Sequence, residues 1–241
     1  MAVPAQPLYL YILNPNNIPR HVGVIMDGNG RWAKKRKVPT LQGHNAGIKS
    51  MKEIVRHASD IGVGYLTVYA FSTENWKRSA EEVSGIFNLL VKFVNLELDE
   101  LNENNVKMNI LGDYTALPKE AVKSIDRSVE LLKNNTGLQF NIALNYGSRQ
   151  EILDAIAKVD DVKNLTEEEF SKLLYTGELD IPDPELVIRT SGEKRLSNFL
   201  MWQSAYSELV FNDKLWPDFT PDDFDQCIEE YQNRKRRFGG R

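Results

Sequence analysis

Cysteine and long apolar runs are both scarce in this chain of 241 residues. Its single cysteine, Cys227, excludes an internal disulfide and a cysteine-rich zinc site, so a reducing compartment is the default expectation. The longest apolar stretch near the N-terminus is "LYLYIL" at 8–13, which lacks a basic flank and is too short for a signal peptide or a membrane span. We therefore expect a cytoplasmic protein.

An excess of positive charge is also absent, since the formal net charge is −4, and the composition gives no reason to expect a nucleic-acid partner. Residues 20–57, however, hold nine lysines and arginines against Asp27 and Glu53, a local charge of +7 that leaves −11 for the remainder. This basic segment on an acidic protein indicates a local anion site, although a solvated face without a partner is the alternative.

Short apolar runs alternate with helical patterns along the chain. Strands that are apolar on both faces need helices to cover them, so this alternation predicts an α/β domain with a mostly parallel sheet. No internal repeat or linker interrupts it, and we expect one domain over 1–241, with 1–18 as a flexible N-terminal segment. The predicted strands are 21–26, 65–71, 106–112, 138–146, 185–190 and 208–211, and the predicted helices are 45–61, 80–104, 118–134, 148–159, 167–176 and 221–236.

Polar side chains gather where the predicted strands end. Open parallel sheets bind ligands outside the carboxyl ends of their strands, so we expect these side chains to converge on one crevice. They are Asp27, Ser72, Glu74, Asn75, Asp113, Asn145, Tyr146 and Arg189.

The loop after the first strand, "GNGRWA" at 28–33, matches the G-x-G-x-x-A fingerprint of dinucleotide-binding proteins. Three features argue against a nicotinamide enzyme. The next strand ends near Phe71, about forty residues on, whereas the ribose-binding acid should follow the glycines by roughly twenty. Arg and Trp are bulky where a pyrophosphate must approach the backbone, and Asp27 would repel a phosphate that carries no metal.

A divalent cation between Asp27 and a diphosphate accounts better for the same loop. Mg²⁺ prefers one or two carboxylates together with phosphate oxygens. Gly28 and Gly30 would let successive N–H groups turn inward as an anion nest, and Arg31 adds a forked donor. A plain Asn-Gly turn with exposed flanks is the alternative.

A second anion site is predicted in "VIRTSGEKRLSNFLMWQ" at 187–203, where Arg189, Arg195 and Ser197 can hold another phosphate group. Taken singly, each arginine is more often part of a surface ion pair. Two anion sites and one metal carboxylate together indicate transfer between two phosphorylated substrates. The segment 84–103 is apolar around more than one helical face, which fits core packing, a subunit interface or the wall of a tunnel for an aliphatic ligand.

With these motifs assembled, the sequence resembles the cis-prenyltransferase family, of the bacterial undecaprenyl diphosphate synthase (isoprenyl transferase) type. The motifs run in the family's order from residue 21 to residue 240. They are "HVGVIMDGNGRWAKKR", "GHNAG", "YAFSTENWKRS", "NIALNYGSRQEI", "LVIRTSGEKRLSNFLMWQSAYSELVF", "LWPDF" and "RKRRFGG".

The resemblance implies a Mg²⁺-dependent enzyme that condenses isopentenyl diphosphate repeatedly onto an allylic primer, usually farnesyl diphosphate. Each step forms a cis double bond, and undecaprenyl diphosphate, a carrier lipid for cell-wall glycans, is the expected product. Asp27 and Asn75 would be catalytic, and Asp27 and Glu208 would bind the metal, Glu208 from across a dimer interface. The implied substrate-binding residues are Gly28, Asn29, Gly30, Arg31, Trp32, His44, Ser72, Thr73, Glu74, Trp76, Arg78, Arg189, Arg195 and Ser197.

The implied fold is a six-stranded parallel sheet flanked by helices around a hydrophobic tunnel, with 84–103 as one wall. A homodimer and a peripheral membrane contact for product release are further expectations. Several family members have Arg where this chain has Thr40, so Arg36 or Lys37 is a candidate for the missing phosphate contact, and Ser191 replaces a common Gly. Ala70 is small, as in long-chain members of the family.

Other functions remain as alternatives to a long-chain synthase. A shorter-product synthase of the same family is one. A non-catalytic partner subunit is another, although Asp27 and Glu208 are both present and favour an enzyme. Trans-prenyltransferases need DDxxD pairs, which neither "DDVKN" at 160–164 nor "DDFDQ" at 222–226 matches. The proton acceptor is left open among Asp27, His44 and the departing diphosphate.

Overall fold

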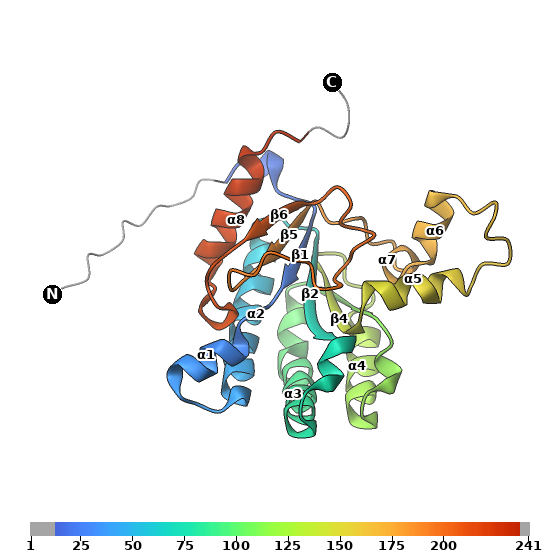
Figure 1. The fold of residues 1–241 in the computed structure, drawn as a ribbon. Helices are drawn as coiled ribbons and strands as arrows, with labels where there is room; N and C mark the ends of the chain where they lie inside the picture. Colours follow the sequence, from blue (N-terminus) through green and yellow to red (C-terminus); the bar gives the residue numbers. More distant parts are fainter. Residues whose placement is uncertain (1–12, 237–241) are drawn as a thin grey trace.

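The structure, a computed structural model, describes residues 13–236 (Figure 1). Six strands form one parallel sheet in the order β3-β4-β2-β1-β5-β6, which confirms the predicted fold class. Each predicted strand is confirmed to within one residue at either end. The strands are β1 (His21–Ile25), β2 (Tyr65–Ser72), β3 (Lys107–Leu111), β4 (Gln139–Tyr146), β5 (Leu186–Arg189) and β6 (Glu208–Phe211).

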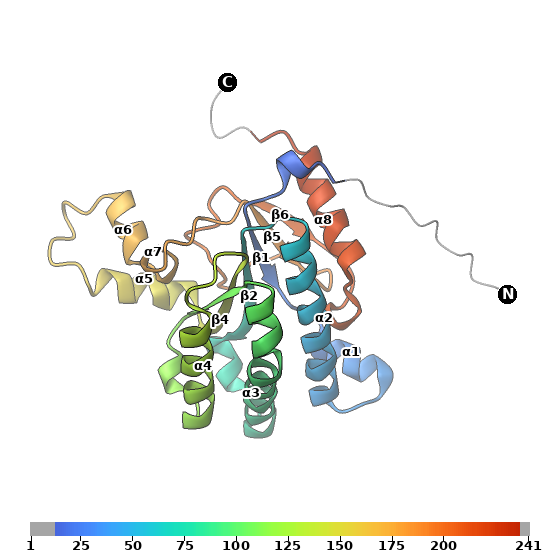
Figure 2. The ribbon, with the colours of Figure 1, turned by 180° about the vertical axis from the view of Figure 1, so that it is seen from behind.

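One face of the sheet is covered by helices that stand in front of it when the molecule is seen from behind (Figure 2). They are α2 (Thr40–Asp60), α3 (Ala80–Glu103), α4 (Lys119–Leu132) and α8 (Pro221–Asn233). Their apolar sides pack on strand residues that point to this face, such as Val22, Val24 and Leu66, none of which has any exposed surface. This layer is the main hydrophobic core.

The other face of the sheet is covered mainly by the irregular segment 190–207. Phe199 and Leu200 of this segment are fully buried against Val187 of β5. Gly23 of β1 makes room for them, because a Cβ at this position would lie 3.2 Å from Phe199 Cε1. Three further helices, α5 (Ser148–Ile156), α6 (Glu167–Leu173) and α7 (Tyr175–Glu178), form an arm at the side of the sheet (Figure 1).

The structure contains a helix that the sequence analysis missed, α1 (Asn29–Arg36). Gly28 is its N-cap with a φ of 117°, and Lys37 ends it in the left-handed conformation with a φ of 56°. Three cations in the last turn favour this helix, because they face the negative end of its dipole. The Asn-Gly pair concealed the helix, since that dipeptide is a strong turn signal.

Other helices also differ from prediction, since α5 ends at Ile156 rather than at 159 and α8 ends at Asn233 rather than at 236. α2 begins at Thr40 rather than at 45, and a Cβ at Gly43 would lie 2.1 Å from Asn29 O, so glycine allows α2 to pack directly on α1. The predicted helix 167–176 is divided into α6 and α7 at Leu174, which is extended with a ψ of 158°. Capping boxes at Thr166 and Thr220 begin α6 and α8.

The part of the chain that the structure describes also contains four short 3₁₀ helices: η1 (Pro15–Asn17), η2 (Thr73–Lys77), η3 (Tyr114–Ala116) and η4 (Trp216–Asp218). Most of the predicted flexible segment 1–18 lies outside the described residues, which begin at 13. In the part that is described, Asn17 O accepts a hydrogen bond from Gln232 Nε2 at 3.0 Å. Within 13–236, every helix is too short or too polar to cross a bilayer.

The strand order reverses around β1, because β2 lies on one side of it and β5 on the other. Ile25, near the end of β1, pairs with Tyr69 of β2 and with Arg189 of β5. The carboxyl ends of these three strands therefore meet at one point, which is where open parallel sheets place their ligands.

Candidate active site

A polar pocket opens where β1, β2 and β5 end. Ten of the predicted catalytic and substrate-binding residues line it, together with Ile25, Met26, Tyr69, Ala70 and Asn198. The predicted polar residues at the ends of β3 and β4, Asp113, Asn145 and Tyr146, do not line this pocket. Asn145 instead binds the Trp76 indole and the Asp113 carbonyl. The ten predicted residues that line the pocket are Asp27, Asn29, His44, Ser72, Glu74, Asn75, Arg78, Arg189, Arg195 and Ser197.

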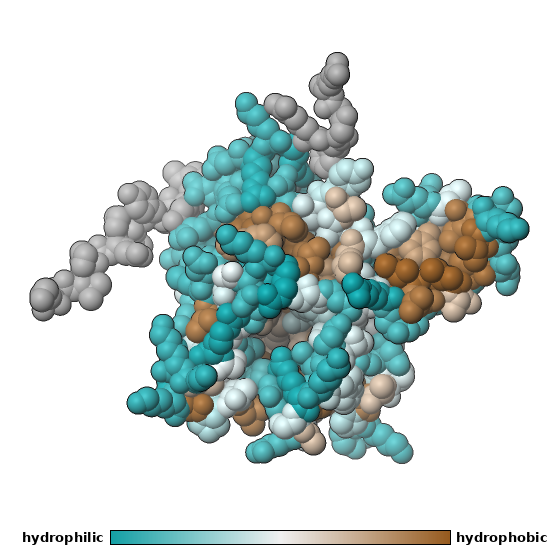
Figure 3. All heavy atoms as spheres, viewed as in Figure 1, coloured by the Kyte–Doolittle hydropathy of each residue, from teal (hydrophilic) through white to brown (hydrophobic). Residues whose placement is uncertain are grey.

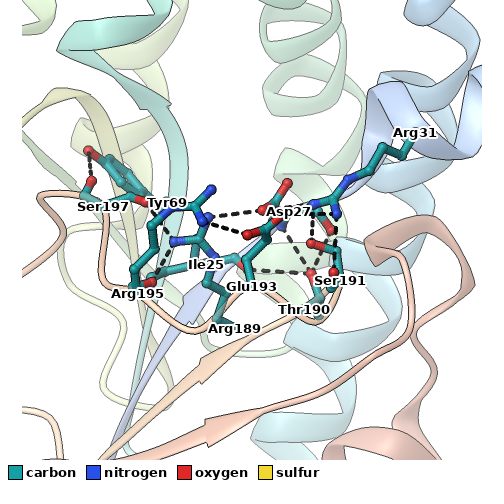
Figure 4. Close-up of polar contacts among 10 residues, drawn as sticks. All are labelled: Ile25, Asp27, Arg31, Tyr69, Arg189, Thr190, Ser191, Glu193, Arg195 and Ser197. Carbon is teal, nitrogen blue, oxygen red and sulfur yellow. Dashed lines mark hydrogen bonds and ion pairs between the residues drawn. The ribbon is translucent and has the colours of Figure 1, made fainter.

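Asp27 lies between two arginines at the centre of this pocket (Figure 4). Its Oδ2 is 3.0 Å from Arg189 Nη2 and 3.1 Å from Arg31 Nη2. Partial burial would raise the pKa of Asp27, but the hydrogen bonds from both guanidinium groups lower it below its ordinary value. The carboxylate is therefore ionised at neutral pH and is available to a hard cation.

The predicted glycine nest is replaced by the N-terminus of α1. Gly28 has the left-handed backbone that the nest requires, but Gly30 is helical. The first helical bond runs from Trp32 N to Gly28 O, so the N–H groups of the preceding helical residues have no partner within the helix. A helix N-terminus with a neighbouring arginine, Arg31, binds anions by the same logic as a nest.

The second predicted anion site is organised by Arg189, whose side chain is only 5% exposed. Its Nη1 donates to Arg195 O at 2.5 Å and to Ser197 Oγ at 2.6 Å. One guanidinium group thus holds Asp27 on one side and the Arg195–Ser197 loop on the other (Figure 4). The two anion sites predicted from separate motifs share this residue.

Glu193 links the same two sites and was missed by the sequence analysis. Its Oε1 lies 3.2 Å from Arg31 Nη1, and its Oε2 lies 2.5 Å from Arg195 Nη1. Arg31 Nη2 also donates to the Ser191 hydroxyl at 2.5 Å. The oxygens of Glu193 and Ser191 thus occupy the donor groups of Arg31 and Arg195 that could otherwise bind phosphate oxygens. A charged residue in a loop gives no local signal that could have identified this role.

The end of β2 supplies the third wall of the pocket. Asn75 Oδ1 accepts from Ser72 N at 3.0 Å in the capping box of η2, which holds both residues in place. Glu74 Oε1 accepts from Asn198 Nδ2 at 2.9 Å. The hydroxyl of Thr73, which follows Ser72 in the chain, donates to Glu74 Oε2 at 3.3 Å.

His44 and Arg78 meet at Glu82 on the side of α3. Glu82 Oε1 is 3.2 Å from His44 Nε2 and 2.8 Å from Arg78 Nη1. Burial lowers the pKa of His44 below its usual value, so the imidazole is neutral at neutral pH. Two buried atoms beside this pocket, Asn29 Oδ1 and Arg189 Nε, have no hydrogen-bond partner among the described residues, as is common where a ligand binds.

An apolar cavity adjoins the polar pocket. Met26, Asn29, His44 and Ala70 line both, so the two are continuous. Its walls come mainly from α2 and α3 and account for part of the apolar surplus in 84–103, while Phe87, Val94, Leu98 and Leu101 belong to the main core. The apolar wall residues from the two helices are Ile48, Met51, Ile86, Leu89, Leu90 and Phe93.

Several predicted residues lie outside the pocket. Trp32 Nε1 donates to Asp218 at 2.8 Å. Arg36 pairs with the same carboxylate, so its guanidinium group is bound outside the pocket and does not make the phosphate contact for which it was a candidate in place of Thr40. Trp76 packs on Phe71 with a centroid distance of 5.2 Å. Lys37 is the residue that ends α1.

Glu208 lies at the opposite end of the sheet from Asp27. It pairs with Leu186 at the start of β5, three residues from Arg189, or roughly 10 Å along the strand. Its Oε2 is 2.7 Å from Arg234 Nη1. Among residues 13–236, no group of three or more His, Cys, Asp or Glu side chains could hold a metal by itself.

Comparison with known proteins gives consistent matches over nearly the whole chain. The family model described as "Putative undecaprenyl diphosphate synthase" matches residues 25–239. An isoprenyl transferase of Clostridium acetobutylicum is 53% identical over 239 residues, which cover 95% of this chain and 92% of the relative. The ditrans,polycis-undecaprenyl-diphosphate synthase ((2E,6E)-farnesyl-diphosphate specific) of Micrococcus luteus is 49% identical, covering 95% and 94%.

A solved structure shows the same fold. The crystal structure of lavandulyl diphosphate synthase from Lavandula x intermedia, in complex with dimethylallyl diphosphate, superposes with a TM-score of 0.89. It is 33% identical in sequence, and the match covers 93% of this chain and 99% of that one.

Proposed function

Because the chain belongs to the undecaprenyl diphosphate synthase family of cis-prenyltransferases, we propose that it adds isopentenyl diphosphate units successively to an allylic diphosphate, with undecaprenyl diphosphate as product. The observation that carries this proposal is the continuity of a pocket rich in arginine with an apolar cavity. The first suits two diphosphates and the second suits a hydrocarbon chain.

Each addition breaks the allylic carbon–oxygen bond and joins the freed carbon to the terminal alkene carbon of isopentenyl diphosphate. The diphosphate leaves with the bonding electron pair, and the new product loses one proton. Arg31 and the N-terminus of α1 would stabilise the charge that develops on the leaving group. Arg195 and Ser197 would hold isopentenyl diphosphate, and the apolar walls of the cavity would exclude water from the cationic carbon.

The donor set at Asp27 fits Mg²⁺ bound jointly with substrate. One ionised carboxylate beside sites for two diphosphates is the arrangement that this cation prefers, because it takes its remaining ligands from phosphate oxygens and water. When bound, the ion would neutralise part of the charge on the leaving diphosphate. Chelation with EDTA should abolish turnover, and added MgCl₂ should restore it.

Glu208 is proposed as the second metal carboxylate, contributed by the other subunit of a homodimer. Its position at the far end of β5 from Arg189 is consistent with action across an interface rather than within one chain. Two features support a dimer: β6 is an edge strand, and apolar side chains gather on the arm of α5 and α6 (Figure 3). Leu153 and Val162 of that arm are 59% and 57% exposed.

The dimer can be tested by light scattering after size-exclusion chromatography. The double variant Leu153→Asp/Ile156→Asp should be monomeric, because charge would be placed in the apolar contact. Leu131→Asp on α4, where Leu131 is 54% exposed, should leave the mass unchanged. A wild-type protein that elutes as a monomer at micromolar concentration would remove the dimer proposal.

We further propose a cytoplasmic enzyme that works at the inner face of the membrane, since its product is a lipid. The direct test of activity is incubation with farnesyl diphosphate and labelled isopentenyl diphosphate, followed by thin-layer separation of the dephosphorylated product. We expect migration with an undecaprenol standard. A shorter product would favour the short-chain alternative, and no incorporation would favour the non-catalytic partner subunit.

A further inference from the structure

Asn198 joins three segments at the rim of the polar pocket. Its Nδ2 donates to Glu74 Oε1 at 2.9 Å, and its Oδ1 accepts from Arg149 N in the first turn of α5, also at 2.9 Å. Its main-chain oxygen accepts from Ser148 N at 2.8 Å. Because Arg149 offers a backbone N–H, the end of the amide that faces α5 must be oxygen, and the NH₂ group must face Glu74.

The backbone around Asn198 is held in a conformation that few residues adopt. Ser197, Asn198 and Leu200 have φ values of 49°, 66° and 42°, all in the left-handed region. Such residues persist only where surrounding contacts hold them, and asparagine tolerates this region better than most. Here the contacts are the amide of Asn198 and the bond from Arg189 to Ser197 Oγ.

The junction is also tightly packed. A Cβ at Gly147 would lie 2.8 Å from Asn198 Nδ2 and 2.7 Å from Thr73 Oγ1. The start of α5 therefore approaches both the loop at 195–200 and the segment after β2. A rigid helix, a phosphate-binding loop and the Glu74 carboxylate meet at one amide group.

We propose that Asn198 is a positioning residue, which fixes Glu74 relative to the loop that carries Arg195 and Ser197. This inference rests on the proposed function, in which Glu74 lies near the reacting carbons and the loop holds isopentenyl diphosphate. The bond between Asn198 and Glu74 would then set the distance between the two substrates. Partial burial would raise the pKa of Glu74, but the hydrogen bond from Asn198, with others from Ser72 and Thr73, lowers it.

A double-mutant cycle of Asn198→Asp and Glu74→Gln tests this role. In the wild-type background, Asn198→Asp sets two carboxylates against each other, and kcat/KM for isopentenyl diphosphate should fall roughly tenfold or more. In the Glu74→Gln background the new carboxylate accepts a bond from the glutamine amide, so the loss should be less than about threefold. Activity of Asn198→Asp should also recover in part toward pH 5, because protonation restores a donor.

Asn164→Asp is a matched control, since Asn164 Nδ2 also donates to a carboxylate, Asp161 Oδ2 at 2.7 Å, in the loop between α5 and α6. It should change kcat/KM by less than about twofold in either background. Equal losses from Asn198→Asp with and without Glu74→Gln would overturn the proposal.

Two further measurements keep the test decisive. If Asn198→Asp does not fold by circular dichroism, Asn198→Gly replaces it, because glycine accepts the left-handed backbone, and the same criterion of a smaller loss beside Glu74→Gln applies. If the wild-type protein makes no polyprenyl product, the proposed function fails by itself. The cycle is then measured on calorimetric titration with inorganic pyrophosphate, where coupling supports the positioning role and additivity overturns it.

Discussion

The guanidinium group of Arg189 is bound directly to the Asp27 carboxylate, with 3.0 Å between Nη2 and Oδ2. Arg189 is buried and Asp27 is partly exposed. The buried guanidinium group therefore holds the carboxylate of Asp27 in place, and the carboxylate faces the pocket. Because Arg189 also binds Ser197, one side chain contacts both predicted anion sites.

Asp27→Asn should lower kcat by roughly a hundredfold or more, because the amide cannot replace a charged ligand in the proposed metal site. The variant keeps the shape of the side chain, and circular dichroism should show a folded protein. Asp126→Asn, which alters a hydrogen-bonded carboxylate on α4, is the control and should retain activity. Substantial turnover by Asp27→Asn would exclude Asp27 from the metal site.

Arg195→Ala should act mainly on binding of isopentenyl diphosphate. The side chain is 60% exposed and pairs with Glu193, which is itself partly exposed, so its loss leaves no buried charge behind. We expect KM for isopentenyl diphosphate to rise about tenfold, with kcat changed much less. Lys194→Ala removes the adjacent exposed cation and should leave both constants near wild type. An unchanged KM for Arg195→Ala would show that this arginine does not contact the substrate.

Ala70→Leu should shorten the product. Ala70 lines both the polar pocket and the apolar cavity, so a larger side chain there narrows the passage between them. Thin-layer analysis should show polyprenols shorter than those of the wild type. Added bulk also costs about 1–3 kcal/mol in a packed site, so the melting temperature should be measured in parallel. Ala116→Leu on exposed η3 is the control, and products of wild-type length from Ala70→Leu would contradict the passage.

His21 should make the protein less stable as the pH falls. Burial lowers its pKa from 6.5 to about 4, while its ring binds Pro182 O at 2.6 Å and Thr67 Oγ1 at 2.7 Å. Between these two values the unfolded chain binds a proton that the folded protein does not bind, so stability is lost on acidification. From pH 7.5 to 5 this amounts to roughly 2 kcal/mol.

Urea unfolding at both pH values measures this effect. Between pH 7.5 and 5, the free energy of unfolding of His21→Gln should fall by roughly 2 kcal/mol less than that of the wild type, even if the variant is less stable overall. A wild-type protein and His21→Gln with the same pH dependence would show that His21 does not titrate in this way.

Local patterns were sufficient to predict the strands and most helices of this protein. Apolar runs of strand length mark β1 to β6, and capping pairs such as Thr166 with Glu169 mark helix starts, because these signals depend only on neighbouring residues. The ends of the strands also predicted Asp27, Glu74 and Arg189 as pocket residues, since a parallel sheet places those ends together.

Tertiary structure alone decided what those residues contact. Glu74 and Asn198 are 124 residues apart, and Arg31 and Glu193 are 162 apart, so no local pattern relates them. Likewise, α1 is supported by the packing of α2 on it at Gly43, a contact that its own sequence does not reveal. The distance of Glu208 from Asp27 follows from the register of β5 and β6. The physical reason is that propensity and periodicity act over a few residues, whereas the geometry of a site is set by how distant strands and loops pack.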